Sequence, residues 1–428
     1  IILDTPERRK IMASEDYKDI FCCIRCAACL NVCPAFRLVG GHVYGGSIYT
    51  GGIGTLLTSF LNSRERGKDI QNICLQCGTC NTVCGGKLDI AGMILKLRTK
   101  FAQEDGLNPV HKFCLDTVAD RHLFHSMLRI ASVAQGMITK GQPMIRHLPM
   151  FLSGLTAGRS LPSVAPQPFR DILPTIKQDV PNPKGKIAIF TGCLLDFVYV
   201  DIATDVVKAL NMAGYIVEMP LGQACCGAPA TYMGDVENAK KAAEMNLNAM
   251  EAEKYDYIVS ACPTCTHALR DYVDFFKDNP EMLKKAEELR SKTFDFCKLV
   301  SMLGGLPDTG DGVPMKVTYH DSCHLNRYLG VTKEQRELLK ATKGVELIEM
   351  HDCDKCCGFG GSYSVKFPEM SAPILEEKIN NIVASGADVV AVDCPGCLLQ
   401  IRGGLDARGL NNIQVKHTAQ IVVKKNRQ

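Results

Sequence analysis

A chain of 428 residues, 46% of them hydrophobic, exceeds one typical domain and can bury two or three cores. Its formal net charge of +3 and the lack of a Lys/Arg-rich run argue against a nucleic-acid partner. The sequence shows neither an apolar stretch of about 18 residues nor a secretory signal, so we expect no transmembrane segment. We expect a cytoplasmic protein, with peripheral attachment at the inner face of the membrane as the alternative. The chain begins at Ile1 rather than at Met, which leaves room for further sequence upstream.

Cysteine is the outlying residue type, with 22 copies gathered in groups of two, three and four. A chain of this length needs no disulfides to compensate for a small core, and tight C-x-x-C groups suit metal better than disulfides. The spacing of the cysteines therefore predicts metal centres in a reducing compartment.

The first two groups both have the C-x-x-C-x-x-C-x-x-x-C spacing of bacterial ferredoxins. In that arrangement three close thiolates bind one cubane [4Fe–4S] cluster and the fourth binds the other cluster. One predicted ligand set is Cys23, Cys26, Cys29 and Cys84, and the other is Cys74, Cys77, Cys80 and Cys33. Zinc is disfavoured, because zinc sites take their ligands as two pairs. We expect a two-cluster, α-helical ferredoxin-like domain over residues 1–110, with Gly40 to Gly54 as a loop.

The next stretch, residues 111–183, is predicted to be a helical segment followed by a Pro-rich linker. Apolar residues recur at helical spacing from Asp116 to Thr139, and the prolines that follow rule out long helices.

From Lys184 onward the sequence repeats itself at an interval of about 130 residues. The first half carries Cys193, Cys225, Cys226, Cys262 and Cys265, and the second carries Cys323, Cys356, Cys357, Cys394 and Cys397. We expect two homologous domains, residues 184–312 and 313–428. Apolar strand candidates run into cysteines at Lys186–Phe190, Tyr257–Val259, Lys316–Tyr319 and Val389–Val392, with helical stretches between them. The fold class is therefore α/β with mainly parallel sheets, and its ligands should gather beyond the carboxyl ends of the strands.

Each rear half offers five thiols that include an adjacent Cys–Cys pair. Two neighbouring cysteines do not easily supply one corner of a cubane, so the pattern favours an open metal cluster. Gly227 and Gly358, which follow the pairs, are predicted to let the backbone approach the metal.

At these motifs the chain resembles the CCG-domain family, which includes a component of heterodisulfide reductase, the glycolate oxidase iron–sulfur subunit and the lactate utilisation proteins. The segment "CIRCAACLNVCPAFRLVGGHVYGG" at Cys23 is similar to the ferredoxin region of lactate utilisation protein B, and "CCGFGGSYSVKFPEMS" at Cys356 to lactate utilisation protein A. The resemblance implies a fusion of the end of B with A, lacking the amino-terminal domain of B. It also implies a non-cubane [4Fe–4S] cluster in one or both halves, with zinc as the alternative for one of them.

Candidate catalytic residues lie around Cys323. A 2-hydroxy acid needs a cation for its carboxylate and a base for its hydroxyl proton. Arg327 is the candidate for the first role, and His324 or His320 for the second. The competing interpretation is that these side chains orient cluster sulfurs.

The predicted function is an iron–sulfur component of an L-lactate-oxidising complex that moves electrons between a CCG cluster and the two cubanes. Expected partners are other dehydrogenase subunits, either a flavoprotein or the missing amino-terminal domain, together with a small 2-hydroxy acid and an electron carrier or quinone. Two alternatives stay open: disulfide reduction as in heterodisulfide reductase, and a pure relay subunit for a flavoprotein that oxidises glycolate or glycerol 3-phosphate.

Overall fold

The computed structural model describes residues 5–136, 144–146, 159–307 and 309–423. The chain forms two compact units, and both are discontinuous in sequence. Unit 1 comprises residues 1–112, 229–236 and 358–374, and unit 2 comprises the remainder. Two short segments of the rear half therefore belong with the ferredoxin-like region. Parts of the predicted linker, 137–143 and 147–158, lie outside the described residues.

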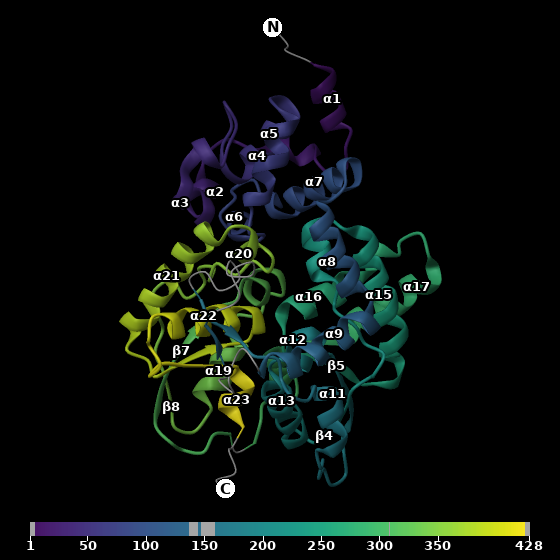
Figure 1. Cartoon of the computed structure of the whole chain (residues 1–428), viewed down its shortest axis with the longest axis vertical. Helices are drawn as coiled ribbons and strands as arrows, with labels where there is room; N and C mark the ends of the chain where they lie inside the picture. The colour runs from purple at the N-terminus through teal and green to yellow at the C-terminus, as the bar shows by residue number, and fades with distance from the viewer. Residues whose placement is uncertain (1–4, 137–143, 147–158, 308, 424–428) are drawn as a thin grey trace. The chain divides into compact units, whose positions relative to one another are not determined.

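Unit 1 is helical in its described residues, as predicted (Figure 1). Its elements are α1 (Pro6–Met12), η1 (Lys18–Cys22), α2 (Ala28–Asn31), α3 (Pro34–Val43), α4 (Gly51–Leu61), α5 (Arg64–Ile70), η2 (Gln71–Ile73), α6 (Thr79–Thr82), α7 (Ile90–Asp105) and α20 (Tyr363–Lys366). Its core is built around the apolar faces of α4 and α7, which contribute Leu56, Ile94 and Leu97. The cysteine runs lie on the short elements at the edge of this core.

The predicted loop from Gly40 to Gly54 is wrong at both ends. Only residues 44–50 lie between α3 and α4, and α4 begins at Gly51. The residues from Gly51 to Thr58 are all buried, so tertiary packing outweighs the low helix propensity of glycine. The small side chains of α4 let neighbouring helices approach closely.

The closest approach to α4 is made by Gly67 of α5. A Cβ atom at Gly67 would lie 2.0 Å from Ser59 Oγ and 2.7 Å from Ser59 Cα, and that second contact is with backbone. We expect Gly67→Ala to push α5 away from α4 and to destabilise unit 1 by about 1–3 kcal/mol. Thermal unfolding of the purified protein measures the loss. The matched control is Gly85→Ala, since a Cβ there meets nothing within 4 Å; equal melting temperatures for the two variants would contradict the packing argument.

Between the ferredoxin-like region and the first sheet, the predicted helical segment consists of two helices, α8 (Pro109–Ala119) and α9 (Arg121–Ala134). The break falls at Asp120, whose carboxylate accepts a hydrogen bond of 3.0 Å from the backbone N–H of Leu123. This contact caps the amino terminus of α9. A two-residue antiparallel pair, β1 (Met144–Ile145) with β2 (Leu161–Pro162), and the short α11 (Phe169–Ile172) and η4 (Leu173–Thr175) follow.

Unit 2 contains two four-stranded parallel sheets, which confirms the α/β class. The first has the order β4-β3-β5-β6 and the second the order β10-β9-β7-β8. The strands are β3 (Gly185–Ile189), β4 (Tyr215–Glu218), β5 (Tyr257–Ser260), β6 (Thr293–Asp295), β7 (Met315–His320), β8 (Val345–Leu347), β9 (Val389–Val392) and β10 (Gln414–Lys416). In each sheet the spatial order, numbered by appearance within that half, is 2-1-3-4. The sequence repeat is thus a repeat of topology.

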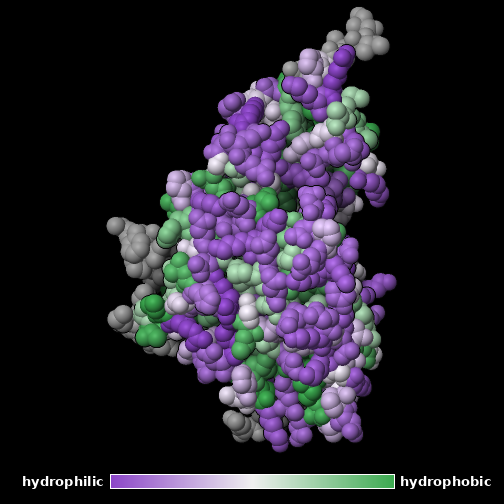
Figure 2. Space-filling model, turned by 90° about the vertical axis from the view of Figure 1, so that its right-hand side faces the viewer, coloured by the Kyte–Doolittle hydropathy of each residue, from purple (hydrophilic) through white to green (hydrophobic). Residues whose placement is uncertain are grey.

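Helices connect and cover these strands. They are α12 (Gly192–Phe197), α13 (Val200–Met212), α15 (Val236–Met250), η5 (Ala252–Lys254), α16 (Pro263–Asp271), η6 (Tyr272–Phe275), α17 (Pro280–Lys292) and α18 (Phe296–Met302) in the first half, and η7 (His324–Tyr328), α19 (Glu334–Lys340), α21 (Pro368–Ser385), α22 (Pro395–Ala407) and α23 (Thr418–Val422) in the second. The helix α14 (Ala228–Met233) belongs to unit 1 except for its first residue. The face in Figure 2 is largely hydrophilic, with hydrophobic residues in separate groups.

The strand order fixes where a ligand should lie. Strands 1 and 3 of each half are neighbours, and the chain leaves them in different directions, which makes this point a topological switch. Cys193 and Cys262 follow β3 and β5, and Cys323 and Cys394 follow β7 and β9. Both halves therefore present cysteines at the position where open parallel sheets bind ligands.

Candidate metal centres

The two ferredoxin-type motifs share one backbone conformation. Arg25 and Gln76 have φ values of 59° and 58°, and Ala27 and Gly78 have φ values of 62° and 71°. Three of these four residues are not glycine, so the left-handed conformation costs free energy at both sites. Alternation of such residues turns successive backbone N–H groups toward a common point, which suits an anionic cluster. The strain is repeated because each motif wraps the same kind of group.

The first predicted ligand set lines a single cavity. Cys23, Cys26, Cys29 and Cys84 all contribute to a cavity of about 300 Å³. Apolar residues complete its wall, among them Ile53. Burial raises the pKa of Cys29, so a cation is needed to hold its thiolate form. The residues present fit a cubane cluster, with the fourth ligand supplied by the other motif.

The second predicted set is also brought together. The pKa of Cys33 is raised to about 12, first by burial and then by the nearby thiols of Cys77 and Cys74. Burial likewise raises the pKa of Cys80, and the negative charges of the nearby Cys74, Cys77 and Cys33 thiolates raise it further. The fourth cysteine of the first motif therefore lies with the second motif, and the reciprocal arrangement holds for Cys84. Four partly buried thiolates, which repel one another, are the donor set whose charge iron would neutralise.

Two residues beside Cys74, the buried Tyr44 and the partly buried Arg98, belong to no motif and were not predicted from the sequence. The hydroxyl of Tyr44 donates a hydrogen bond to the Cys74 thiol. Arg98 on α7 donates to the carbonyl oxygen of Cys74 at 3.1 Å and to that of Gln71 at 2.6 Å. Burial raises the pKa of the Cys74 thiol, and the charge of Arg98 partly opposes that rise. Arg98 also donates to the carbonyl oxygen of Tyr232 at 2.7 Å, which ties residues 229–236 to the rest of unit 1.

In the first rear half the five thiols form a connected series. Cys193 contacts Cys225, Cys225 contacts Cys226, Cys226 contacts Cys265, and Cys265 contacts Cys262 through hydrogen-bonded sulfurs. Hydrogen bonds from Cys225 and Cys265 lower the pKa of Cys226. The adjacent pair thus faces the C-x-x-C motif.

Two buried side chains hold the adjacent pair of the first half in place. Asn246 donates to the carbonyl oxygen of Cys225 at 2.9 Å, and the Tyr272 hydroxyl donates to that of Cys226 at 3.0 Å. Asn246 also donates to the Tyr272 hydroxyl, at 2.9 Å. This network fixes the direction of both thiols.

The second half repeats the series. Cys323 contacts Cys356, and Cys357 contacts Cys397, which contacts Cys394. Cys394 and Cys262 are both the N-cap residues of helices that begin with proline, α22 and α16, so a thiolate there gains from the helix amino terminus. The pKa of Cys394 is lowered by hydrogen bonds from Cys262 and Cys397.

The thiol sets of the two halves therefore meet. Cys262 of the first half and Cys394 of the second are hydrogen-bonded to each other, and both belong to unit 2. All ten predicted thiols therefore belong to one connected group within unit 2. The donor set is the chemistry that an iron–sulfur cluster requires.

The two glycines after the cysteine pairs lie close to helices, and their approach to a metal stays a prediction. Gly227 and Gly358 have φ values of +78° and +81°, which only glycine adopts without strain. A Cβ at Gly227 would lie 3.3 Å from the carbonyl oxygen of Ala239 on α15, and one at Gly358 would lie 2.7 Å from that of Ser371 on α21. These glycines let the turn approach a helix.

Of the predicted catalytic residues, His320 is buried and His324 is partly buried, and both lie beside the thiols. Burial lowers the pKa of His320 to about 3 and that of His324 to about 4, so both are neutral at pH 7. The Nδ1 atom of His324 lies 3.3 Å from Thr264 Oγ1, and its ring stacks on Tyr328 with centroids 5.1 Å apart.

Arg327, the third predicted catalytic residue, is already paired with another residue of the chain. It donates to the carbonyl oxygen of Asp354 at 2.7 Å and to the carboxylate of Asp354 at 3.2 Å. The contact with Cys356 and burial raise the pKa of the Cys323 thiol, and the charge of Arg327 partly opposes that rise, so the guanidinium lies near the second thiol set.

The cysteine-bearing regions match two known protein families. Residues 19–88 match the 4Fe-4S dicluster domain, and residues 187–270 and 317–402 match the cysteine-rich (CCG) domain. Lactate utilization protein A of Shouchella clausii is 39% identical over 240 residues, which is 56% of this chain and 99% of that protein. The chain belongs to the cysteine-rich (CCG) domain family of iron–sulfur proteins.

Other relatives extend the comparison. Lactate utilization protein A of Bacillus velezensis is 37% identical over 238 residues, 55% of this chain and 98% of that protein. The probable glycolate oxidase iron–sulfur subunit of Bacillus subtilis is 29% identical over 428 residues, which is 96% of this chain and 94% of that protein. A crystal structure of a hypothetical protein from Helicobacter pylori aligns over 87% of this chain and 76% of that one, with 10% identity and a TM-score of 0.43, too low to be informative.

The full-length match bears on the fusion predicted from the sequence. A CCG-family relative aligns across both the dicluster and the cysteine-rich regions, in one chain. The same order of domains therefore occurs in a single-chain relative, and a fusion with lactate utilisation protein B is not required to explain it. No helix in the described ranges is both long and apolar enough to span a bilayer.

Proposed function

We propose that this chain is the iron–sulfur electron-transfer subunit of a complex that oxidises a small 2-hydroxy acid, with L-lactate as the first candidate. The observation that carries the proposal is the contiguous set of ten rear thiols, in a chain that also holds a dicluster region. Bound clusters would supply one-electron redox steps, which suits a reaction that releases two electrons and two protons as lactate becomes pyruvate. The similarity to lactate utilization protein A over the rear half supports the choice of substrate.

The chain's own residues have separable roles in this proposal. The front cysteines bind the two cubanes, and the ten rear cysteines bind the open clusters. Arg327 binds the substrate carboxylate in exchange for its contact with Asp354, which is half exposed. Neutral His324 accepts the hydroxyl proton.

The role of Arg327 gives a direct prediction. We expect Arg327→Ala to raise the KM for lactate at least about tenfold, because a bidentate contact with a carboxylate contributes more than about 1.4 kcal/mol. Steady-state dye reduction at varied lactate measures this change. Arg336→Ala is the matched control, because Arg336 is in the same half and pairs with Asp321 and Glu349. An unchanged KM in Arg327→Ala protein with full metal content would remove Arg327 from substrate binding.

A second candidate function is the reduction of a disulfide to two thiols, which consumes two electrons and two protons. The contact between Cys262 and Cys394 favours it, because the thiol sets of the two halves meet and two single electrons are needed at one S–S bond. A third candidate is a relay for a glycolate-oxidising or glycerol-3-phosphate-oxidising flavoprotein, and the full-length likeness to a probable glycolate oxidase subunit supports it.

Partner subunits are part of the proposal. The α9 helix carries exposed apolar residues at helical spacing: Leu123, Met127 and Ile130. An apolar stripe in water is a feature that a protein partner would cover.

One assay separates the candidates. Purified, metal-loaded protein is supplied anaerobically with lactate, with glycolate, or with a disulfide and a reductant, each with and without an added flavoprotein. We expect lactate-dependent dye reduction. Activity with glycolate only in the presence of the flavoprotein would support the relay, and disulfide consumption alone would support the second candidate.

A further inference from the structure

The two rear halves differ beside their thiols. His320 is the last residue of β7 and lies three positions before Cys323. The corresponding residue of the first half, three positions before Cys193, is Phe190. Both side chains are fully buried. A duplicated fold thus carries a phenyl ring in one copy and an imidazole in the other.

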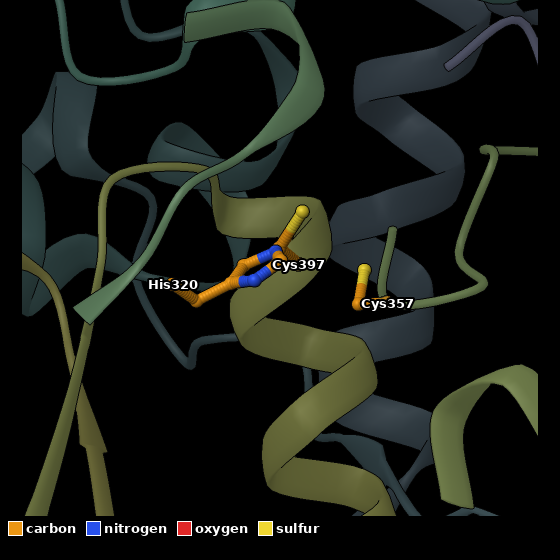
Figure 3. A group of neighbouring side chains, drawn as sticks. All are labelled: His320, Cys357 and Cys397. Atoms are coloured by element: carbon orange, nitrogen blue, oxygen red, sulfur yellow. The ribbon is translucent and has the colours of Figure 1, made fainter. Parts of the chain in front are cut away.

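The imidazole lies among sulfur atoms. The donor atoms of His320, Cys357 and Cys397 all lie within 4.8 Å of one another, the only group of this kind in the described part of the chain. In Figure 3 the ring of His320 extends from the end of its strand toward Cys397 on α22, and Cys357 approaches from the opposite loop. Three elements of one half therefore present a nitrogen and two sulfurs to one point.

The ring nitrogens of His320 lack hydrogen-bond partners among the residues that the structure describes. Neither Nδ1 nor Nε2 of His320 makes a hydrogen bond of good geometry among the described residues, although both atoms are buried. The backbone carbonyl of Cys353 lies near the ring, and its effect on the pKa of His320 is smaller than that of burial. A buried polar group without a partner costs about 1–3 kcal/mol, so native proteins rarely keep one without a ligand. Imidazole nitrogen is a common ligand of both iron and zinc.

We propose that His320 is a nitrogen ligand of the metal group bound by the second half, so that this site has mixed nitrogen and sulfur donors while the first half has sulfur alone. The inference rests on the proposed metal binding by the rear cysteines. Its consequence is an asymmetric pair of sites. Where the neutral imidazole occupies a coordination position that a thiolate fills in the first half, the bound iron cluster is less negative and its reduction potential is higher, so the second site is the better electron acceptor. His320 is then unavailable as a base, which leaves His324 for the proton.

Isotope labelling tests the assignment without any activity measurement. Protein grown with ¹⁵N-histidine is reduced and examined by pulsed EPR for a histidine nitrogen coupled to iron. If the second half holds zinc, X-ray absorption at the zinc edge looks for the nitrogen scatterer. We expect nitrogen at one of these metals in the parent protein, and its loss in His320→Phe, which copies Phe190.

The control is His324→Phe, since His324 is a neighbouring, partly buried histidine whose Nδ1 lies near Thr264; this variant should retain the nitrogen signal. His320→Cys should restore metal content with a spectrum of sulfur only. Rear metal without any nitrogen in the parent protein would overturn the inference and leave the proposed function standing. A rear half without metal would overturn both, and the parent measurement decides even if a variant fails to fold.

Discussion

Replacing Cys226 by Ala is expected to remove about four iron atoms per chain and to lower substrate-dependent dye reduction at least about a hundredfold. Cys226 lies at the centre of the first rear thiol series, between Cys225 and Cys265. Without the Cys226 sulfur, no thiol of the adjacent pair contacts Cys265 of the C-x-x-C motif, and the five-thiol series is broken. Iron analysis and EPR of anaerobically purified protein measure the result.

The same variant should leave the cubanes intact, because their predicted ligands are in unit 1. The EPR signals of two cubanes should therefore persist. Cys114→Ala is the control, since Cys114 is exposed and belongs to no motif. If the iron content of Cys226→Ala protein equals that of the control, the rear cysteines do not bind iron as a set.

Replacing Arg98 by Met should lower the reduction potential of the cubane on Cys74, Cys77, Cys80 and Cys33. The partly buried guanidinium lies near Cys74 and stabilises added negative charge there. Without it the reduced cluster loses a favourable interaction, and we expect a fall of roughly 60 mV, a tenfold change in a one-electron equilibrium. Potentiometric titration followed by EPR measures the shift.

The Arg98 substitution should also destabilise unit 1. The carbonyl oxygens of Gln71, Cys74 and Tyr232 each lose a donor, and each unsatisfied buried acceptor costs about 1–3 kcal/mol. Lys100→Met on the same helix is the control, because Lys100 is exposed and pairs only loosely with Glu104. A cubane potential equal to that of the control would show that the charge of Arg98 does not reach the cluster.

The strands before the rear cysteines could be predicted because each is a short buried apolar run that ends at a motif residue. The predicted Val389–Val392 is β9, and Tyr257–Val259 differs from β5 by one residue. The repeat interval then gave the second sheet from the first. Local pattern and global fold agree here, so sequence alone is informative.

Other features depend on contacts between distant segments. The assignment of residues 229–236 and 358–374 to unit 1 rests on contacts such as that of Arg98 with Tyr232, which no local pattern encodes. The helix α4 could not be predicted, because glycines in a sequence indicate a loop. Its packing against α5, where Gly67 lies close to Ser59, is visible only in the structure. Tyr44 and Arg98 are single residues without a motif. His320 was found from the sequence, but its position among sulfurs became visible only with the fold.

The central claim is that these thiols bind iron–sulfur clusters in both the front and the rear of the chain. Iron, zinc and acid-labile sulfide per chain, measured on anaerobically purified protein, test it most directly. We expect about sixteen iron atoms with matching sulfide, or about twelve with one zinc if the second half holds a single ion. Colourless protein without labile sulfide, or iron that stops at about eight atoms with no metal in the rear halves, would contradict the claim.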